Sequence, residues 1–233
     1  MTITLCGIDG VKGGWISATA SLDAEKITGI QLSFHPTLLS PFFQKIQLAA
    51  IDMPIGLPKQ TRKGGRLAEK QARPFLKKRA SSLFSTPCRS TLSAQSYAEA
   101  LSLSRASGPD GLGLSIQSYN ILPKIKVLDA LLQEDIPLRE RIYESHPELA
   151  FSAMHPQTEF QSKYSSIGRS QRMAALRSQD CMPNKWLEKY PMEDQLDALA
   201  CLWSARRIHL GLATMVPNPP PYDETGLRMA ICW

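Results

Sequence analysis

Aspartates stand at the ends of two apolar runs that lie far apart in the chain. Asp9 follows Leu5-Cys6-Gly7-Ile8, and Asp52 follows Leu48-Ala49-Ala50-Ile51. A second acidic pair, Asp194 and Asp197, opens the last long helical pattern. A carboxylate at the end of a buried strand is costly unless its charge has a partner. If these ends meet, the partner that suits oxygen ligands alone is Mg²⁺ or Mn²⁺, not zinc.

Such a cluster suits phosphodiester hydrolysis, because two ions can activate water and stabilise the leaving oxygen. The candidate catalytic residues are Asp9, Asp52, Asp194, Asp197 and Glu144, and the four aspartates are the candidate metal ligands. Three of these residues have a simpler alternative. Asp9 could cap a glycine hairpin, Asp52 could end its strand in an Asx-type turn, and Asp194 could complement a helix dipole. The chain has no nucleophile elbow and no Walker loop.

A basic segment follows the second aspartate. Residues 59–79 carry nine Lys or Arg against the single Glu69, in a chain whose net charge is +6. Such a segment predicts a polyanionic partner, DNA or RNA, with a merely solvated face as the alternative. Pro74 breaks any helix there. The candidate nucleic-acid-binding residues are Lys12, Arg66, Lys70, Arg73, Lys77 and Arg79.

The elements that must position these residues follow from hydrophobic periodicity. Three strands, expected to form an antiparallel meander, are predicted at 3–9, 14–20 and 27–34. A fourth, apolar throughout and therefore central and parallel, is predicted at 48–53, and a fifth at 139–145. Helices are predicted at 37–47, 94–106, 117–133, 169–178 and 192–210, with loop at 81–96 and a short edge strand at 227–233.

Composition sets the broad class. The 233 residues are 43% hydrophobic and 21% charged, which predicts a globular protein with a real core. The N-terminus has no secretory pattern, and no apolar run approaches the ~18 residues of a membrane span. Five cysteines without a CxxC motif indicate neither a zinc site nor a disulfide framework. We therefore expect a cytoplasmic protein without membrane contact. The oligomeric state stays open, with a homodimer possible.

Several motifs together resemble an uncharacterised family described as predicted RNase-H-like nucleases. They lie at 7–15, 51–57, 72–82, 113–117, 123–125, 144–148 and 194–199. The resemblance implies an α/β fold: an RNase-H-like mixed five-stranded sheet flanked by helices, in a single domain over 1–233. A mostly helical insertion would follow the fourth strand, at about 59–133. It also implies that Asp9, Asp52, Asp194 and Asp197 hold Mg²⁺ or Mn²⁺.

These observations predict a metal-dependent nuclease that cleaves DNA or RNA by a two-metal mechanism. One alternative is a non-catalytic nucleic-acid-binding module on the same fold. A less favoured one is an actin-like or sugar-kinase-like phosphotransferase, since Gly7-Ile8-Asp9-Gly10 also opens those folds. That class normally needs two such domains, and this chain is short for it.

Overall fold

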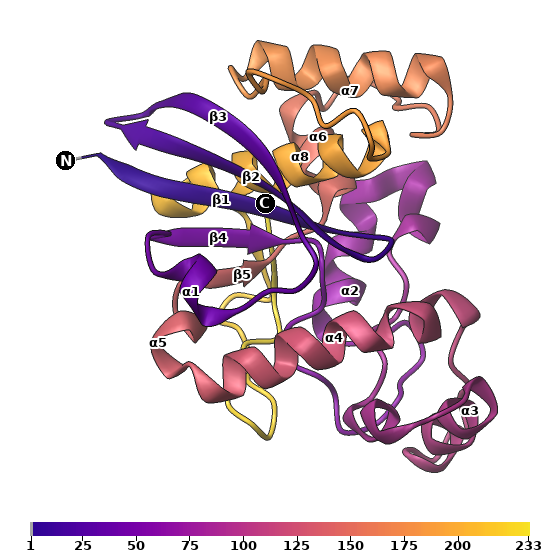
Figure 1. Cartoon of the computed structure of the whole chain (residues 1–233). Coiled ribbons are helices and arrows are strands. Elements are labelled where there is room, and N and C mark those ends of the chain that lie inside the picture. Colours follow the sequence, from indigo (N-terminus) through magenta and orange to yellow (C-terminus); the bar gives the residue numbers. More distant parts are fainter. Residues whose placement is uncertain (1) are drawn as a thin grey trace. The chain divides into compact units, whose positions relative to one another are not determined.

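The structure is a computed structural model that describes residues 2–233, and its architecture is α/β (Figure 1). A mixed sheet of seven strands has the order β3-β2-β1-β4-β5-β7-β6. The strands are β1 (Ile3–Val11), β2 (Gly14–Asp23), β3 (Lys26–His35), β4 (Leu48–Ile51), β5 (Ile142–Glu144), β6 (Met215–Val216) and β7 (Ile231–Cys232). The α-helices are α1 (Ser40–Phe43), α2 (Leu67–Ala72), α3 (Tyr97–Ala106), α4 (Ile116–Glu134), α5 (Ile136–Arg139), α6 (Pro147–Met154), α7 (Ser166–Ser178) and α8 (Met192–His209).

The chain divides into two compact units, and the chain passes between them more than once. The first contains the residues up to Met53, then Glu140–Thr214 and Cys232–Trp233. The second contains Pro54–Arg139 and Met215–Ile231. All the predicted catalytic residues fall in the first unit, and the basic segment falls in the second.

The first unit is built on the meander β1-β2-β3. β1 and β2 pair antiparallel around the turn at Gly13, whose φ of 81° is readily adopted only by glycine. β4 then pairs parallel to β1, and β5 pairs parallel to β4. Residues 5–9 of β1 and 49–51 of β4 are buried, as expected for central strands of a sheet.

Helix α8 packs directly on β1 because Gly7 has no side chain. A Cβ built at Gly7 would lie 2.0 Å from the Leu202 amide nitrogen and 2.1 Å from the Ala198 carbonyl oxygen. The helix is buried from Gln195 to Ala205, and α6 and α7 pack against it (Figure 1). This close approach fixes the position of α8 over the centre of the sheet.

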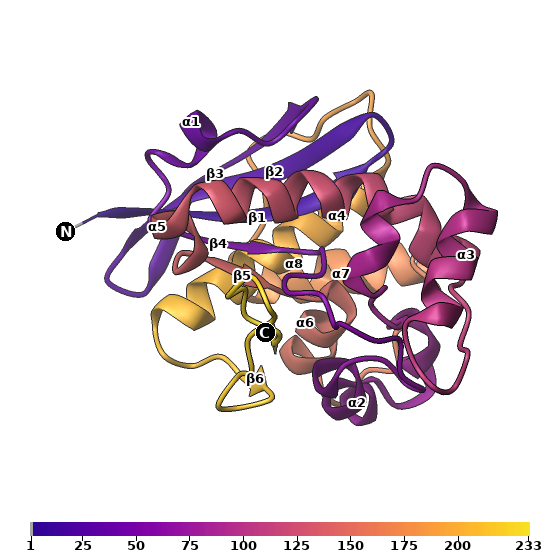
Figure 2. The same ribbon diagram turned by 90° about the horizontal axis from the view of Figure 1, so that it is seen from below.

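The second unit is mostly helical, with α3 beside the long α4 (Figure 2). Two 3₁₀ segments, η1 (Arg73–Ser82) and η2 (Arg89–Ser93), accompany them. Arg89 ties together the two chain segments of this unit. Its guanidinium bonds both carboxylate oxygens of Asp129 at 2.9 Å and one of Asp223 at 2.5 Å.

Several element predictions need correction. The sheet has seven strands, not five. β7 lies within the edge strand predicted at 227–233, although β6 and not β7 is at the edge, and the two-residue β6 left no periodic pattern. The helix expected at 37–47 is only the single turn of α1. The strand expected at 139–145 shrinks to β5, since the residues up to Arg139 are helical. Helix α6 and the turn η2 were not predicted.

Across residues 2–233, no helix has both the length and the apolar character needed to span a bilayer.

Candidate metal centre

Asp9 and Asp52 lie side by side at one edge of the sheet. β1 and β4 are parallel neighbours, and the amide of Asp52 donates a 2.9 Å hydrogen bond to the carbonyl of Ile8. Both strands therefore run in the same direction, and each places an aspartate at the same end of the sheet. Asp9 is buried, at 6% exposure, and Asp52 is partly buried.

Helix α8 brings the third carboxylate to this edge. Asp197 directly precedes Ala198, whose carbonyl faces Gly7 of β1, and only 2% of Asp197 is exposed. Asp194 lies almost one turn earlier on the same helix and is partly exposed. The absence of a side chain at Gly7 thus places a carboxylate of α8 beside those of the sheet.

The aspartates share one electrostatic environment. Burial, followed by repulsion from Asp52 and Asp197, raises the pKa of Asp9 well above its ordinary value. Asp194 also contributes to this rise in the pKa of Asp9. For Asp52, burial and then Asp197 raise the pKa to about 8, with a further contribution from Glu144. Like charges gathered in a low-dielectric place produce this pattern, and added positive charge relieves it.

A lysine supplies part of that positive charge. Lys163, in the loop between α6 and α7, donates a hydrogen bond from Nζ to Asp197 Oδ2. Burial by itself would lower the pKa of Lys163, but attraction to Asp197, Asp9 and Asp52 raises it above the ordinary value. Conversely, burial raises the pKa of Asp197 and Lys163 opposes that rise.

Two glutamates border the cluster. Glu144, 6% exposed, ends β5, and the amide of the next residue donates to the Ile51 carbonyl at 2.9 Å. Glu148 lies in the first turn of α6. Both of its carboxylate oxygens accept hydrogen bonds, at 2.6 and 2.9 Å, from Nη2 of the fully buried Arg172. Glu148 is therefore neutralised by its own partner, and Arg172 also holds the carbonyl of Gln161 in the loop that carries Lys163.

The chemistry of these residues fits a hard divalent cation. The Oδ1 atom of Asp197 is buried and, within residues 2–233, has no hydrogen-bond partner, whereas Oδ2 is held by Lys163. A buried carboxylate oxygen left open beside two acids with raised pKa values is what a cation would satisfy. The same range contains no set of three or more His, Cys, Asp or Glu side chains already gathered at metal-binding spacing. Side-chain rotation would therefore have to complete the ligand set.

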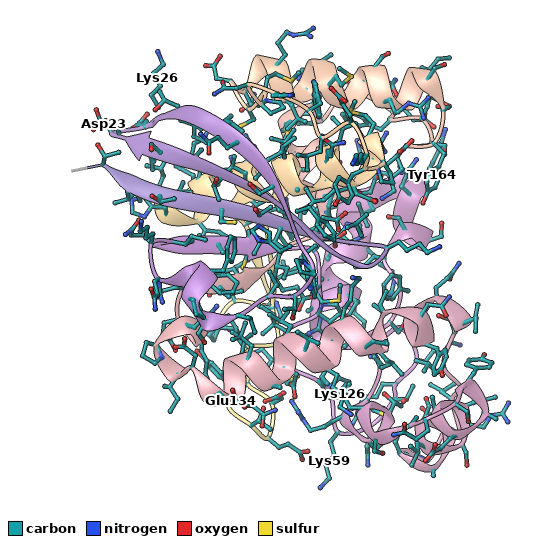
Figure 3. The ribbon with its side chains drawn as sticks, viewed as in Figure 1. Asp23, Lys26, Lys59, Lys126, Glu134 and Tyr164 are labelled. Carbon is teal, nitrogen blue, oxygen red and sulfur yellow. The ribbon has the colours of Figure 1, made fainter. Side chains whose placement is uncertain are left out.

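The predicted nucleic-acid-binding residues have different environments. Lys12 is exposed in the turn after β1, and Lys70 and Lys77 are exposed in the second unit. Arg79 is partly buried there. Figure 3 shows Lys59, at the start of the basic segment, extending away from the ribbon.

Two of the predicted cations have structural partners. Arg66 is 5% exposed, and its guanidinium bonds Glu69 at 2.8 Å and the carbonyls of Ile55 and Gly56 at 2.6 and 2.8 Å. Arg73 bonds the carbonyls of Gly64 and Leu83. Arg66 is therefore not the surface cation that its charge and spacing predicted.

One family model matches the chain, over residues 7–222. It describes a protein of unknown function, DUF429. The chain belongs to the DUF429 family. Comparisons with curated proteins and with solved structures give no match.

Sequence reasoning missed two residues of the candidate site in this DUF429 chain, Lys163 and Arg172. Lys163 stands in the run Gln161-Ser162-Lys163-Tyr164-Ser165, which has neither periodicity nor a motif. No signal in one sequence marks such a loop lysine, because only the docking of α6 and α7 on α8 directs it inward.

The raised pKa of Asp52 predicts how stability depends on pH without metal. A carboxyl whose folded pKa exceeds its ordinary 3.8 contributes stability that is fully present below 3.8 and is lost as pH rises through about 8. Metal-free protein should therefore be less stable at pH 9 than at pH 6. Asp52→Asn removes this charge and should stabilise the metal-free DUF429 chain at pH 8 by about 1–3 kcal/mol.

Denaturant unfolding in a chelator, at a series of pH values, measures this difference. The curve for Asp52→Asn should be flatter than that of the parent, and added Mn²⁺ should stabilise the parent more than the variant. Parallel pH curves for the two proteins would contradict the assignment.

Proposed function

We propose that this chain is a metal-dependent nuclease that hydrolyses phosphodiester bonds of DNA or RNA on an RNase-H-like sheet. One observation carries the proposal. Asp9, Asp52 and Asp197 gather at one edge of the sheet, where Asp52 and Asp197 raise the pKa of Asp9, Asp197 raises the pKa of Asp52, and an oxygen of Asp197 stays buried and unpartnered. The resemblance of the motifs to predicted RNase-H-like nucleases supports the same function.

The strand arrangement supports the RNase-H-like part of the proposal. Three antiparallel strands followed by two parallel ones, in the order β3-β2-β1-β4-β5, agree with the arrangement that the resemblance implies. An acid on the first strand, one after the fourth and one on the final long helix also agree with it.

Each residue has a definite role. Asp9 and Asp52, on neighbouring strands, and Asp197, on α8, hold the cation, with Asp194 at the rim. When bound, Mg²⁺ or Mn²⁺ activates a water and stabilises the leaving oxygen. Glu144 adds negative potential at Asp52 and so favours cation binding there. Lys12 is exposed three residues beyond Asp9, where it can contact a phosphate of the substrate.

The test is cleavage of labelled single-stranded, double-stranded and branched DNA and RNA, with Mg²⁺ or Mn²⁺ and with a chelator. Cleavage should require the divalent ion and should stop on chelation. No cleavage of any of these substrates, together with no binding of Mn²⁺ in equilibrium dialysis, would overturn the proposal.

The basic segment supplies the second testable part of this function. Lys59, Lys63 and Lys70 are exposed, so replacing all three by Ala removes charge without disturbing a buried partner. We expect weaker binding of DNA and RNA. Each lost phosphate contact should also flatten the log–log salt dependence on duplex DNA by about 0.9.

A matched variant controls for net charge. Lys26, Lys45 and Lys189 are equally exposed but belong to the first unit, outside the basic segment. Replacing these three by Ala should leave both affinity and salt slope close to the parent values. Equal losses in the two triple variants would show that the segment contributes only general charge.

A further inference from the structure

Lys163 is directed inward from a loop whose next residue points outward. Its side chain is 25% exposed, and its ammonium is bonded to Asp197. Tyr164 is 74% exposed and projects away from the ribbon (Figure 3). The fully buried Arg172 holds this loop by a hydrogen bond to the Gln161 carbonyl. The inward position of Lys163 is therefore built into the packing of α6, α7 and α8.

The ammonium of Lys163 lies close to the carboxylates that would bind a metal cation. Asp197, Asp9 and Asp52 are the carboxylates that act most strongly on Lys163. The two oxygens of Asp197 are divided, since Oδ2 receives the Lys163 bond and Oδ1 is buried without a partner. One carboxylate can therefore serve two cations, as a bridging carboxylate does between two metal ions.

The charges of the three aspartates and Lys163, taken together, match one divalent ion. When ionised, Asp9, Asp52 and Asp197 carry three negative charges, and Lys163 leaves two of them unbalanced. Glu148 and Glu193 are paired with Arg172 and Arg169 at 2.6 and 2.7 Å, whereas Glu144 and Asp194 at the border act on Asp52 and Asp9.

We propose that this centre binds a single divalent cation and that the ammonium of Lys163 occupies the place of a second. The proposal rests on the nuclease function proposed above and, in place of the two-metal mechanism expected from the sequence, assigns one ion and one lysine. Asp194 and Glu144 stay at the border, where Asp194 is partly exposed to water.

The experiment counts Mn²⁺ ions per chain on the full-length protein, by equilibrium dialysis and by electron paramagnetic resonance. The parent should bind one Mn²⁺ tightly and give the spectrum of an isolated ion. Lys163→Gln should bind two, with the line broadening of ions ~3.5–4 Å apart. Lys163→Arg keeps the charge and should bind one. Lys26→Gln, an exposed lysine at the far end of the β2–β3 hairpin, should behave as the parent.

The outcomes separate this inference from the proposed function. Two tightly bound ions in the parent would overturn the inference and leave the nuclease intact. No bound ion in the parent would overturn both. A single ion in Lys163→Gln, bound as in the parent, would show that Lys163 does not hold a cation position. If Lys163→Gln fails to fold, the count for the parent still decides, since it needs no variant.

Discussion

We expect Asp9→Asn to abolish divalent-ion-dependent cleavage, with a loss of at least about 10³-fold. Asn keeps the shape of the side chain but carries no charge, so a ligand of the cation is lost while the fold is kept. Because Asp9 is buried and its pKa is raised by its neighbours, the neutral side chain should also relieve repulsion. Cleavage rates and Mn²⁺ affinity, measured on the same preparation, test both consequences.

Asp23→Asn is the matched control. Asp23 is an exposed aspartate that ends β2, at the opposite end of the β1–β2 hairpin from Asp9. The same chemical change there should leave cleavage and Mn²⁺ binding at the parent level. Cleavage that survives Asp9→Asn unchanged would remove the aspartate cluster from the mechanism, whatever the control shows.

The second large effect is structural. Gly7→Ala should destabilise the protein by about 3–5 kcal/mol, because a Cβ would overlap the backbone of α8. Backbone atoms at 2.0 and 2.1 Å cannot be avoided by a rotamer change, so α8 must shift away from β1. The shift also moves Asp197 away from Asp9. We therefore expect denaturant unfolding to show the same loss of stability with and without a chelator. The protein that remains folded should bind Mn²⁺ more weakly.

Gly29→Ala separates this packing effect from the general cost of replacing glycine. Gly29 has φ of 66°, but nothing lies within 4 Å of a Cβ built there. Only backbone strain applies, so the cost should be about 1 kcal/mol with Mn²⁺ binding unchanged. If both variants lost the same stability, the close approach of α8 would not limit the fold.

The sequence predicted the strands of the first unit well because they are long and apolar. The strand predicted at 3–9 is observed as Ile3–Val11, and the helix predicted at 192–210 as Met192–His209. The unbroken apolar run of β4 predicted a central parallel strand, and β4 is observed to pair parallel to β1. Each aspartate directly follows an apolar run that was predicted as a strand. The shared position of Asp9 and Asp52 therefore followed from the pattern. Their function as metal ligands stays a prediction.

Other features could not follow from local pattern. A charge such as Arg66 looks the same in the sequence whether it meets solvent or, as here, Glu69 and two carbonyls. The inward direction of Lys163 depends on helices far away in the chain. A two-residue strand such as β6 is defined only by its neighbours in space. Each is decided by tertiary packing, which has no period along the chain.

The order of strands along the chain has a consequence for synthesis. The meander β1-β2-β3 is local and can form as soon as it leaves the ribosome, whereas β5 pairs with β4 only after residues 54–139 have been made. Asp197 follows Asp52 by 145 residues, an interval of roughly 7–30 s at ordinary translation rates. During that time Asp9 and Asp52 remain open to water, so their mutual repulsion is weak. The electrostatic cost of the cluster arises only when α8 docks, which makes this docking the folding step that divalent ions should accelerate.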